Sequence, residues 1–168
     1  VAAKKGISLQ LQLPTGPLLV NTDPGALTKI INNLLINDIK FSASGSQITV
    51  CVQKVGLVVQ ISVADQGIGI HSEDLPRIFD RFYRVDPSRS RKTGGTGLGL
   101  AIVKELTTEL GGRVEVSSQP NQGSTFTLTF PICSMPNTQA LKQKTTKKQD
   151  SCCHQEILPR ADLSKALL

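Results

Sequence analysis

Residues 65–70 read Asp-Gln-Gly-Ile-Gly-Ile, and residues 94–100 read Gly-Gly-Thr-Gly-Leu-Gly-Leu. The first stretch places the carboxylate of Asp65 between an apolar segment and a Gly-X-Gly turn. A carboxylate there can accept a hydrogen bond from the amino group of a purine, although an Asx-turn explains the same residue equally well. The second stretch leads directly into an amphipathic helix, so that free backbone N–H groups and the helix dipole face any anion placed there. Together the two stretches indicate a nucleotide-binding site.

The glycine-rich stretch matches neither of two common phosphate-binding motifs. No Gly-Lys-Ser/Thr follows it, so it is not a Walker A loop, and the spacing of Gly95, Gly97 and Gly99 does not fit the dinucleotide fingerprint. A flexible linker would also be rich in glycine. These glycines run straight into a strongly amphipathic helix, which argues against a linker.

The first predicted helix carries a narrow polar face. An Asp-Pro pair at residues 23–24 is typical of a helix start, and the pattern continues to about residue 41. A step of about 100° per residue places Asn33, Asn37 and Lys40 on one side. Amide oxygens suit Mg²⁺ and an ammonium suits phosphate oxygens, so the face fits a metal-bound polyphosphate. A solvated surface is the ordinary alternative, but asparagine disfavours helices and two in register need a reason.

Hydrophobic periodicity and turn residues predict the other elements. Residues 83–96 are polar, basic and end in glycine, which is typical of a mobile loop, and residues 134–155 are polar and aperiodic. The remaining predictions are strands at 7–13, 47–53, 57–64, 114–118 and 124–130, a short helix from Ser72 to about Phe82, a long helix at 97–110 with Leu98, Ile102, Leu106 and Leu110 on one stripe, and a weak helix at 157–168.

Length and composition favour one globular domain with a tail. The chain has 168 residues, of which 39% are apolar, and with no tryptophan and one tyrosine its core must consist of Leu, Ile and Val. The net charge is +6, and much of it lies in residues 77–92 and 142–148. The second run contains no aromatic residue and lies in a polar tail, where solvated disorder is the ordinary interpretation, so we expect no nucleic-acid binding.

Cysteine spacing and hydropathy suggest a reducing compartment. The four cysteines, at positions 51, 133, 152 and 153, have no Cys-X-X-Cys spacing, and we expect free thiols. No signal peptide and no apolar run near 18 residues is found. Because the chain begins with Val1 rather than methionine, we expect a fragment whose parent protein could carry a membrane anchor.

These stretches, in this order, resemble the catalytic ATP-binding domain of sensor histidine kinases, within the superfamily shared by gyrase, the Hsp90 chaperone and MutL. The resemblance covers roughly residues 1–131, and the Phe-containing motif with its Tyr-Arg-Val-Asp continuation favours a histidine kinase over the gyrase and chaperone relatives. The matching motifs are the N box at 33–41, the G1 box at 65–70, the F box at 78–83, the G2 box at 95–100 and the smaller G3 element at 123–125.

The resemblance implies a role for each of these residues, with ATP and Mg²⁺ as the bound groups. Asp65 would bind the adenine amino group, and Asn37 would ligate Mg²⁺ with Asn33 beside it. Lys40 and Arg84 would contact phosphates, so that Asn33, Lys40 and Arg84 would support the transfer chemistry. The other expected nucleotide-binding residues are Phe41, Gly67, Gly69, Ile70, Gly95, Thr96, Gly97, Leu98, Gly99 and Thr125.

The resemblance also implies a fold and partners. The fold would be a two-layer α/β sandwich, a mixed sheet covered on one face by helices, with residues 83–96 as a mobile ATP lid. Residues 1–133 would form the catalytic domain and residues 134–168 a polar, disordered tail. The implied partners are a histidine-bearing dimerisation domain of the same protein and a response regulator. We expect a monomeric, cytoplasmic fragment.

Two features of the sequence depart from what the resemblance implies. The chain has only His71 and His154, and neither has the helical surroundings of a phosphoacceptor, so this fragment should bind ATP without phosphorylating itself. Asp38 stands where the family usually carries a small residue such as alanine. Its helical angle, about 140° from Asn33, places it among apolar residues. A buried, unpaired carboxylate there would cost several kcal/mol or be forced to protonate. We therefore expect that Asp38 either destabilises the domain or has a specific partner.

Three functions remain open on this reading. The first is a protein-histidine kinase catalytic domain. The second is an ATP-binding regulatory module without transfer activity, which Asp38 and the missing acceptor histidine make possible. The third is an ATPase-driven conformational machine of the gyrase type.

Overall fold

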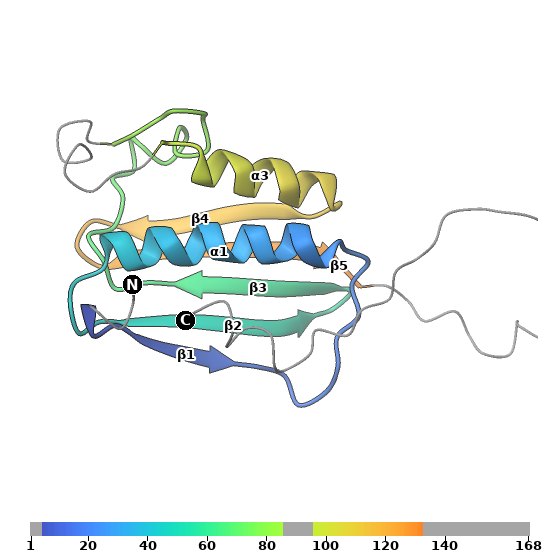
Figure 1. The fold of residues 1–168 in the computed structure, drawn as a ribbon. Helices are drawn as coiled ribbons and strands as arrows, with labels where there is room; N and C mark the ends of the chain where they lie inside the picture. The colour runs from blue at the N-terminus through green and yellow to red at the C-terminus, as the bar shows by residue number, and fades with distance from the viewer. Residues whose placement is uncertain (1–4, 86–95, 133–168) are drawn as a thin grey trace, which may run out of the picture.

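A computed structural model describes residues 5–85 and 96–132 (Figure 1). The predictions for the centre of the lid and for the tail, including the weak helix at 157–168, lie outside these residues. The predicted strands and both long helices are present. The elements are β1 (Ser8–Gln12), α1 (Pro24–Phe41), β2 (Gln47–Val55), β3 (Val58–Ala64), α3 (Gly99–Glu109), β4 (Arg113–Gln119) and β5 (Gly123–Pro131).

The predicted short helix at 72–82 is wrong. This segment is a run of turns, in which backbone N–H groups donate to carbonyls three residues earlier: Asp74 to His71 at 3.0 Å, Arg77 to Asp74 at 2.9 Å and Asp80 to Arg77 at 2.8 Å. Pro76 explains the difference, because it lacks an N–H group and its ring clashes with the carbonyl four residues before it.

The five strands form one mixed sheet in the order β1-β2-β3-β5-β4. β1 and β2 are parallel, with Leu9 opposite Ile48, and every other neighbouring pair is antiparallel. Parallel strands need a crossover connection, which α1 supplies between β1 and β2. α1 and α3 lie side by side on the same face of the sheet (Figure 1), so the predicted two-layer α/β sandwich is confirmed.

The core lies between the helices and that face of the sheet. Strand residues alternate, so every second side chain of β2, β3 and β5 points to the helices. α1 is fixed at its start by Asp23, whose carboxylate accepts a hydrogen bond from Ala26 N–H at 2.7 Å, as the Asp-Pro pair predicted. The buried apolar side chains of these elements are Leu27, Ile30, Ile31, Leu34, Leu35, Ile39, Ile48, Val50, Val52, Val59, Ile61, Val63, Phe126, Leu128 and Phe130.

The second long helix is rotated from the expected stripe. The buried residues of α3 are Ala101, Val103 and Thr107, whereas the predicted stripe of Leu98, Ile102, Leu106 and Leu110 is only partly buried. α3 contacts both α1 and β4, so its packing face is set by two neighbours and includes the small residues that permit close approach. Among the described residues, neither helix is long and apolar enough to cross a membrane.

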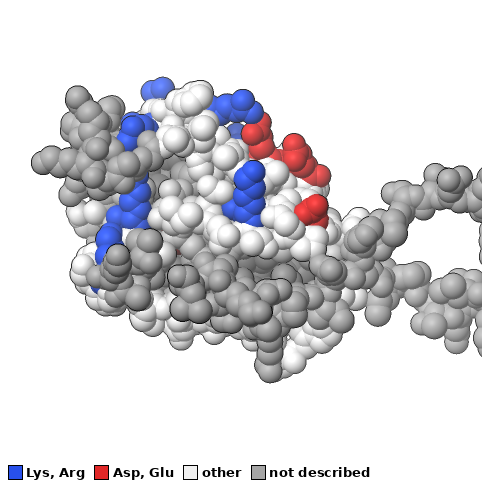
Figure 2. All heavy atoms as spheres, in the orientation of Figure 1, with Lys and Arg blue, Asp and Glu red and all other residues white. Residues whose placement is uncertain are grey.

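Both β3 and α1 end at the same edge of the molecule, on the left in Figure 1. Several basic side chains lie along this end of the face, others lie at its centre and top, and the acidic ones gather at the opposite end (Figure 2). The fold therefore brings the end of the N box, the residue after β3 and a positive surface together.

Candidate functional site

Asp65 follows the last residue of β3 and is held by two backbone N–H groups. Its Oδ1 accepts a hydrogen bond from Gly67 N–H at 2.5 Å, and its Oδ2 accepts one from Ser124 N–H at 3.1 Å. The bond to Gly67 is an Asx-turn, so the structural alternative for this residue is present. Each oxygen still has a second lone pair for a ligand. Partial burial raises the pKa of Asp65, and the bonds from Gly67 and Ser124 oppose that rise.

The turn after Asp65 requires glycine. A Cβ atom on Gly67 would lie 2.6 Å from the Phe41 carbonyl oxygen, and one on Gly69 would lie 1.9 Å from the Gln119 carbonyl oxygen. Gly69 also has a φ of +66°, which side chains rarely adopt. The turn is thus wedged between the end of α1 and the β4–β5 connection.

The two asparagines of the N box face the start of α3. A Cβ atom on Gly99 would lie 3.2 Å from Asn33 Oδ1 and 3.6 Å from Asn37 Nδ2. Asn33 Nδ2 donates to the Lys29 carbonyl at 2.8 Å, which leaves its oxygen directed toward α3. α3 begins at Gly99, and its N-cap residue Leu98 makes no side-chain cap, so the first N–H groups of the helix have no side-chain partner among the residues that the structure describes. The amide row and the glycine-rich helix start therefore border one space.

Phe82 and Gly97, which flank the expected lid, are joined by a backbone contact. Phe82 N–H donates to the Gly97 carbonyl at 2.9 Å, and a Cβ atom on Gly97 would lie 2.9 Å from the Phe82 backbone. Phe82 itself has a φ of +66° and is 69% exposed. Of the expected lid residues, Thr96 is exposed, and Gly95 lies outside the described residues.

Lys40 and Arg84 lie close enough to repel each other. Burial, and then the charge of Arg84, lower the pKa of Lys40. The Lys40 ammonium lies 5.1 Å from the centre of the Phe41 ring. Arg84 Nη2 is buried and makes no hydrogen bond within the described part of the chain. Two neighbouring cations of this kind are suited to a polyanion.

Asp38 is buried, as its helical angle predicted. It is 2% exposed, and its Oδ2 makes no hydrogen bond to any described residue. Burial, and then the nearby charge of Asp65, raise the pKa of Asp38 to about 8. Its carboxyl group is therefore protonated at neutral pH. The specific partner that could have explained an aspartate here is not found among residues 5–85 and 96–132.

Several contacts of the site were not predicted. Ser118 Oγ accepts a hydrogen bond from Ile70 N–H at 2.8 Å and donates to the Gly123 carbonyl at 2.8 Å. The backbone N–H of Ser124 donates to Asp65, while the neighbouring Thr125, which pairs with Ala64 in the sheet, is half-buried. Lys5 contacts the end of α1. Most of these contacts join residues far apart in sequence, so no local sequence pattern predicts them.

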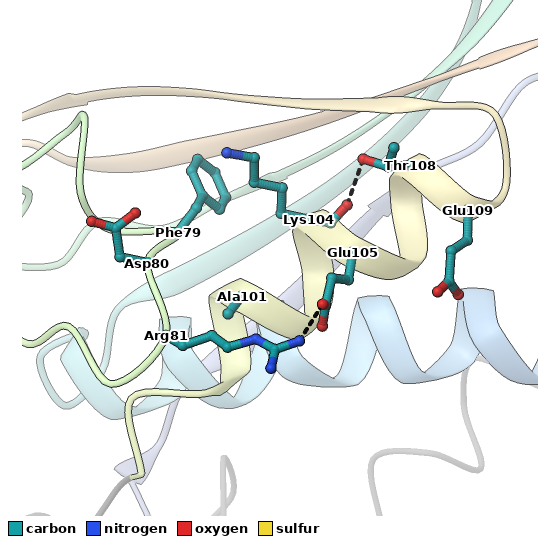
Figure 3. A pocket seen from close by; sticks show the side chains of 8 residues that line it. All are labelled: Phe79, Asp80, Arg81, Ala101, Lys104, Glu105, Thr108 and Glu109. Carbon is teal, nitrogen blue, oxygen red and sulfur yellow. Dashed lines mark hydrogen bonds and ion pairs between the residues drawn. The ribbon is translucent and has the colours of Figure 1, made fainter.

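An open groove lies elsewhere, between α3 and the turns of the F box (Figure 3). Its volume is about 530 Å³, and it is crossed by an ion pair between Arg81 and Glu105. Lys104 lies along its wall, 5.8 Å from the ring of Phe79. None of the expected nucleotide-binding residues lines this groove.

The donors near the amide row fit a magnesium ion held partly by a ligand. Among the described residues, no group of three or more His, Cys, Asp or Glu side chains is placed to hold a metal. Mg²⁺ in nucleotide sites is commonly held by few protein oxygens together with phosphate oxygens and water. The carbonyl oxygens of Asn33 and Asn37 suit that arrangement.

His71 is exposed in the turns after Ile70.

Comparison with known proteins identifies the family. The profile described as "Histidine kinase-, DNA gyrase B-, and HSP90-like ATPase" matches residues 22–134, and this chain belongs to that family. The sensor-like histidine kinase SenX3 of Mycolicibacterium smegmatis is 46% identical over 125 residues, 74% of this chain and 32% of SenX3. The sensor histidine kinase WalK of Bacillus subtilis is 43% identical over 121 residues, 71% of this chain and 20% of WalK. The chain thus spans a third or less of these relatives.

Solved structures agree with this assignment. The mycobacterial sensor histidine kinase MprB superposes with a TM-score of 0.67 and 28% identity, covering 80% of this chain and 88% of that one. Full-length ShkA in complex with AMPPNP superposes with a TM-score of 0.69 and 31% identity, covering 81% of this chain and 28% of ShkA. Within the broad family, the resemblance to histidine kinases is therefore confirmed.

Proposed function

We propose that this chain is the ATP-binding catalytic domain of a sensor histidine kinase, which transfers the γ-phosphate of ATP to a histidine on a separate dimerisation domain. One observation carries the proposal: the amide row of Asn33 and Asn37 faces an uncapped helix start, at the edge of the fold where Asp65 is also held. The base of a nucleotide would fit beside Asp65, and its polyphosphate chain would fit between the amide row and the start of α3.

At the base end, Asp65 would accept a hydrogen bond from the adenine amino group. Its two existing hydrogen bonds fix the carboxylate, and an acceptor that is already fixed loses less conformational entropy when a ligand binds. Ile70 and Phe41 border the same turn and would offer apolar contact to the base. AMPPNP, an adenine nucleotide analogue, is bound by the relative ShkA, which supports this choice of base.

At the phosphate end, Lys40, Arg84 and the start of α3 would neutralise the polyphosphate. The mutual repulsion of Lys40 and Arg84 would be relieved by a bound anion. Asn37, with Asn33 beside it, would hold Mg²⁺, which when bound neutralises charge on the phosphate oxygens. The first N–H groups of α3, from Gly99 onward, would donate to the same oxygens.

The residues of this domain would then act mainly by position and charge. Lys40 and Arg84 would draw electron density from the γ-phosphate while an imidazole nitrogen of the acceptor histidine attacks in line. Holding the reacting groups in place and stabilising the developing charge account for most catalysis of phosphoryl transfer. The chain's own histidines do not supply the acceptor on this proposal.

The partners we propose follow from the same function. They are the histidine-bearing dimerisation domain and a response regulator, with this domain monomeric and cytoplasmic within a parent protein that could be membrane-anchored. We propose no nucleic-acid partner.

The direct test combines the folded chain, a separately made histidine-bearing hairpin and radiolabelled ATP. Acid-labile label on the hairpin histidine would support the kinase, and Asp65→Asn should remove it along with nucleotide binding. Wild-type protein that shows no heat of binding with Mg²⁺ and AMPPNP would overturn the proposal.

The second candidate is an ATP-binding regulatory module without transfer activity. Asp38 favours it, because a buried carboxyl group lies near Asp65, at the end of the site that would hold the base. Binding of AMPPNP without label on any acceptor histidine would support the module. Steady phosphate release by the chain alone would instead support a gyrase-type ATPase.

A further inference from the structure

The end of α1 carries Asn37 and Lys40, which the proposed function assigns to the phosphate end, and Phe41, which it places beside the base. The backbone of this last turn is held from outside the helix. The last four carbonyls of a helix have no partner within it. Here those of residues 38–41 are each accounted for. The Asp38 carbonyl accepts from Ser42 N–H at 2.9 Å, and the Phe41 carbonyl accepts from Ile68 N–H at 3.3 Å.

Lys5 binds the two carbonyls that remain. Its Nζ donates to the Ile39 carbonyl at 2.8 Å and to the Lys40 carbonyl at 3.1 Å, and also to the Ser42 carbonyl at 3.3 Å. An ammonium group has three hydrogens to donate, which matches the three carbonyls. The end of a helix also carries a partial negative charge, so a cation there is favourable.

The backbone of Lys5 is itself anchored. Its carbonyl accepts a hydrogen bond from Gly45 N–H at 3.0 Å, and Ser8 N–H donates to the Ser46 carbonyl at 3.0 Å. The segment that leads into β1 is therefore bound to the α1–β2 connection at Lys5 itself and again at Ser8. As a result, the Lys5 ammonium restricts the position of the last turn of α1.

We propose that Lys5 is a positioning residue for the phosphate end of the nucleotide site. It acts through the backbone of α1, by fixing the turn that carries Asn37 and Lys40 against the Gly67–Gly69 turn after Asp65. It does not touch the base end directly. This inference rests on the proposed function, since it assigns Lys5 a role only if a nucleotide is bound there.

The test measures binding of Mg²⁺-AMPPNP and of adenosine to the whole chain by calorimetry. Lys5→Met keeps the aliphatic stem and removes all three donors. We expect it to weaken AMPPNP binding about tenfold while adenosine binding changes less than about threefold. Lys5→Arg keeps a cation with several donors and should restore most of the AMPPNP affinity. Equal losses for both ligands would overturn the proposal, because a merely structural role lowers both.

Two control variants separate positioning from charge and from stability. Lys54→Met makes the same change of charge on an exposed lysine of β2 and should leave both affinities unchanged. Val52→Ala removes buried volume from the core and should lower the melting temperature without changing the ratio of the two affinities. If Lys5→Met does not fold, Lys5→Gln, which keeps one amide donor group, gives the same comparison.

The outcomes distinguish this inference from the proposed function. Wild-type protein that binds neither ligand would overturn the proposed function itself. Wild-type protein that binds AMPPNP while Lys5→Met binds it equally well would overturn only the role of Lys5.

Discussion

Two aspartates of this domain differ in how far they are buried and in whether hydrogen bonds compensate that burial. Asp65 is partly buried, and two backbone N–H groups compensate its charge. Asp38 is more deeply buried, and its Oδ2 has no such compensation among the described residues. The same residue type therefore has two different energetic roles, and the difference depends on which N–H groups lie within reach.

Replacing Asp38 should stabilise the domain, and more so at higher pH. Because the folded-state pKa, about 8, lies above the ordinary value of 3.8, the unfolded chain releases this proton first. The wild-type carboxyl group is thus tolerated below pH 4, and folding stability is lost as the pH rises toward 8, by up to about 1.4 kcal/mol per pH unit. We expect Asp38→Asn to flatten this loss, measured as the free energy of unfolding in urea from pH 4 to 8.

The matched control for this experiment is Asp80→Asn, which removes an exposed carboxylate from the turns before Arg81. It should reproduce the wild-type pH profile. A wild-type stability that does not fall relative to Asp38→Asn between pH 4 and pH 8 would show that Asp38 has a compensating partner.

Gly69→Ala should destabilise the domain. Its φ is +66°, and the added Cβ atom would lie 1.9 Å from the Gln119 carbonyl oxygen, so the backbone must move. We expect a loss of about 1–3 kcal/mol in the free energy of unfolding, measured by urea denaturation. Gly16→Ala is the control, because nothing lies within 4 Å of its added Cβ atom. That substitution should be neutral or raise stability by up to about 1 kcal/mol. Equal effects at both glycines would contradict the geometry of the turn.

At the scale of elements, two faces of α1 have different structural roles. Its apolar face covers the sheet, and its amide face borders the start of α3. The ends of the helix are fixed by residues outside it: Asp23 at the start, and Lys5 and Ile68 at the finish. The packing of the apolar face therefore determines where the amide row lies.

Shortening single side chains of α1 should distinguish its buried face from its exposed face. Leu34 is 0% exposed, and Leu34→Ala should lower the free energy of unfolding by about 2–5 kcal/mol through lost burial and a cavity. Ile36 lies two residues later on the same helix and is 63% exposed, so Ile36→Ala should change stability by less than about 0.5 kcal/mol. Chemical denaturation of the two variants measures the difference, and similar losses would mean that α1 packs with a different face.

At the scale of the whole molecule, the site depends on three distant parts of the chain. The N box, the turn after Asp65 and the start of α3 meet at one edge of the sheet, because α1 and β3 end there. A ligand that binds all three would hold the layers together. Such a ligand stabilises the folded state by mass action, by about 2.7 kcal/mol at a concentration of 100 times its Kd.

The melting temperature should therefore rise with the concentration of Mg²⁺-AMPPNP. Asp65→Asn should remove most of this rise, while Leu57→Ala, at the opposite end of β3 and 85% exposed, should retain it. Differential scanning fluorimetry with and without magnesium measures both effects. A ligand-dependent rise that survives Asp65→Asn unchanged would show that the nucleotide binds elsewhere.

The sequence by itself determined the strands and the two long helices, the two-layer class of the fold and the family. These depend on local signals: the Asp-Pro helix start, the alternation in β2, β3 and β5, and glycines that must accept close contacts or positive φ. The short helix at 72–82 failed where Pro76 removed a donor that a helix needs.

Only the tertiary structure decided which groups meet. Four features depend on how distant segments are placed together: the contact of Lys5 with the end of α1, the bond from Ser124 N–H to Asp65, the packing face of α3, and the lack of a hydrogen bond to Asp38 Oδ2 from any described residue. The physical reason is that periodicity and turn chemistry act between residues a few positions apart. Hydrogen bonds and burial at the site act between residues that become neighbours only when the helices settle on the sheet.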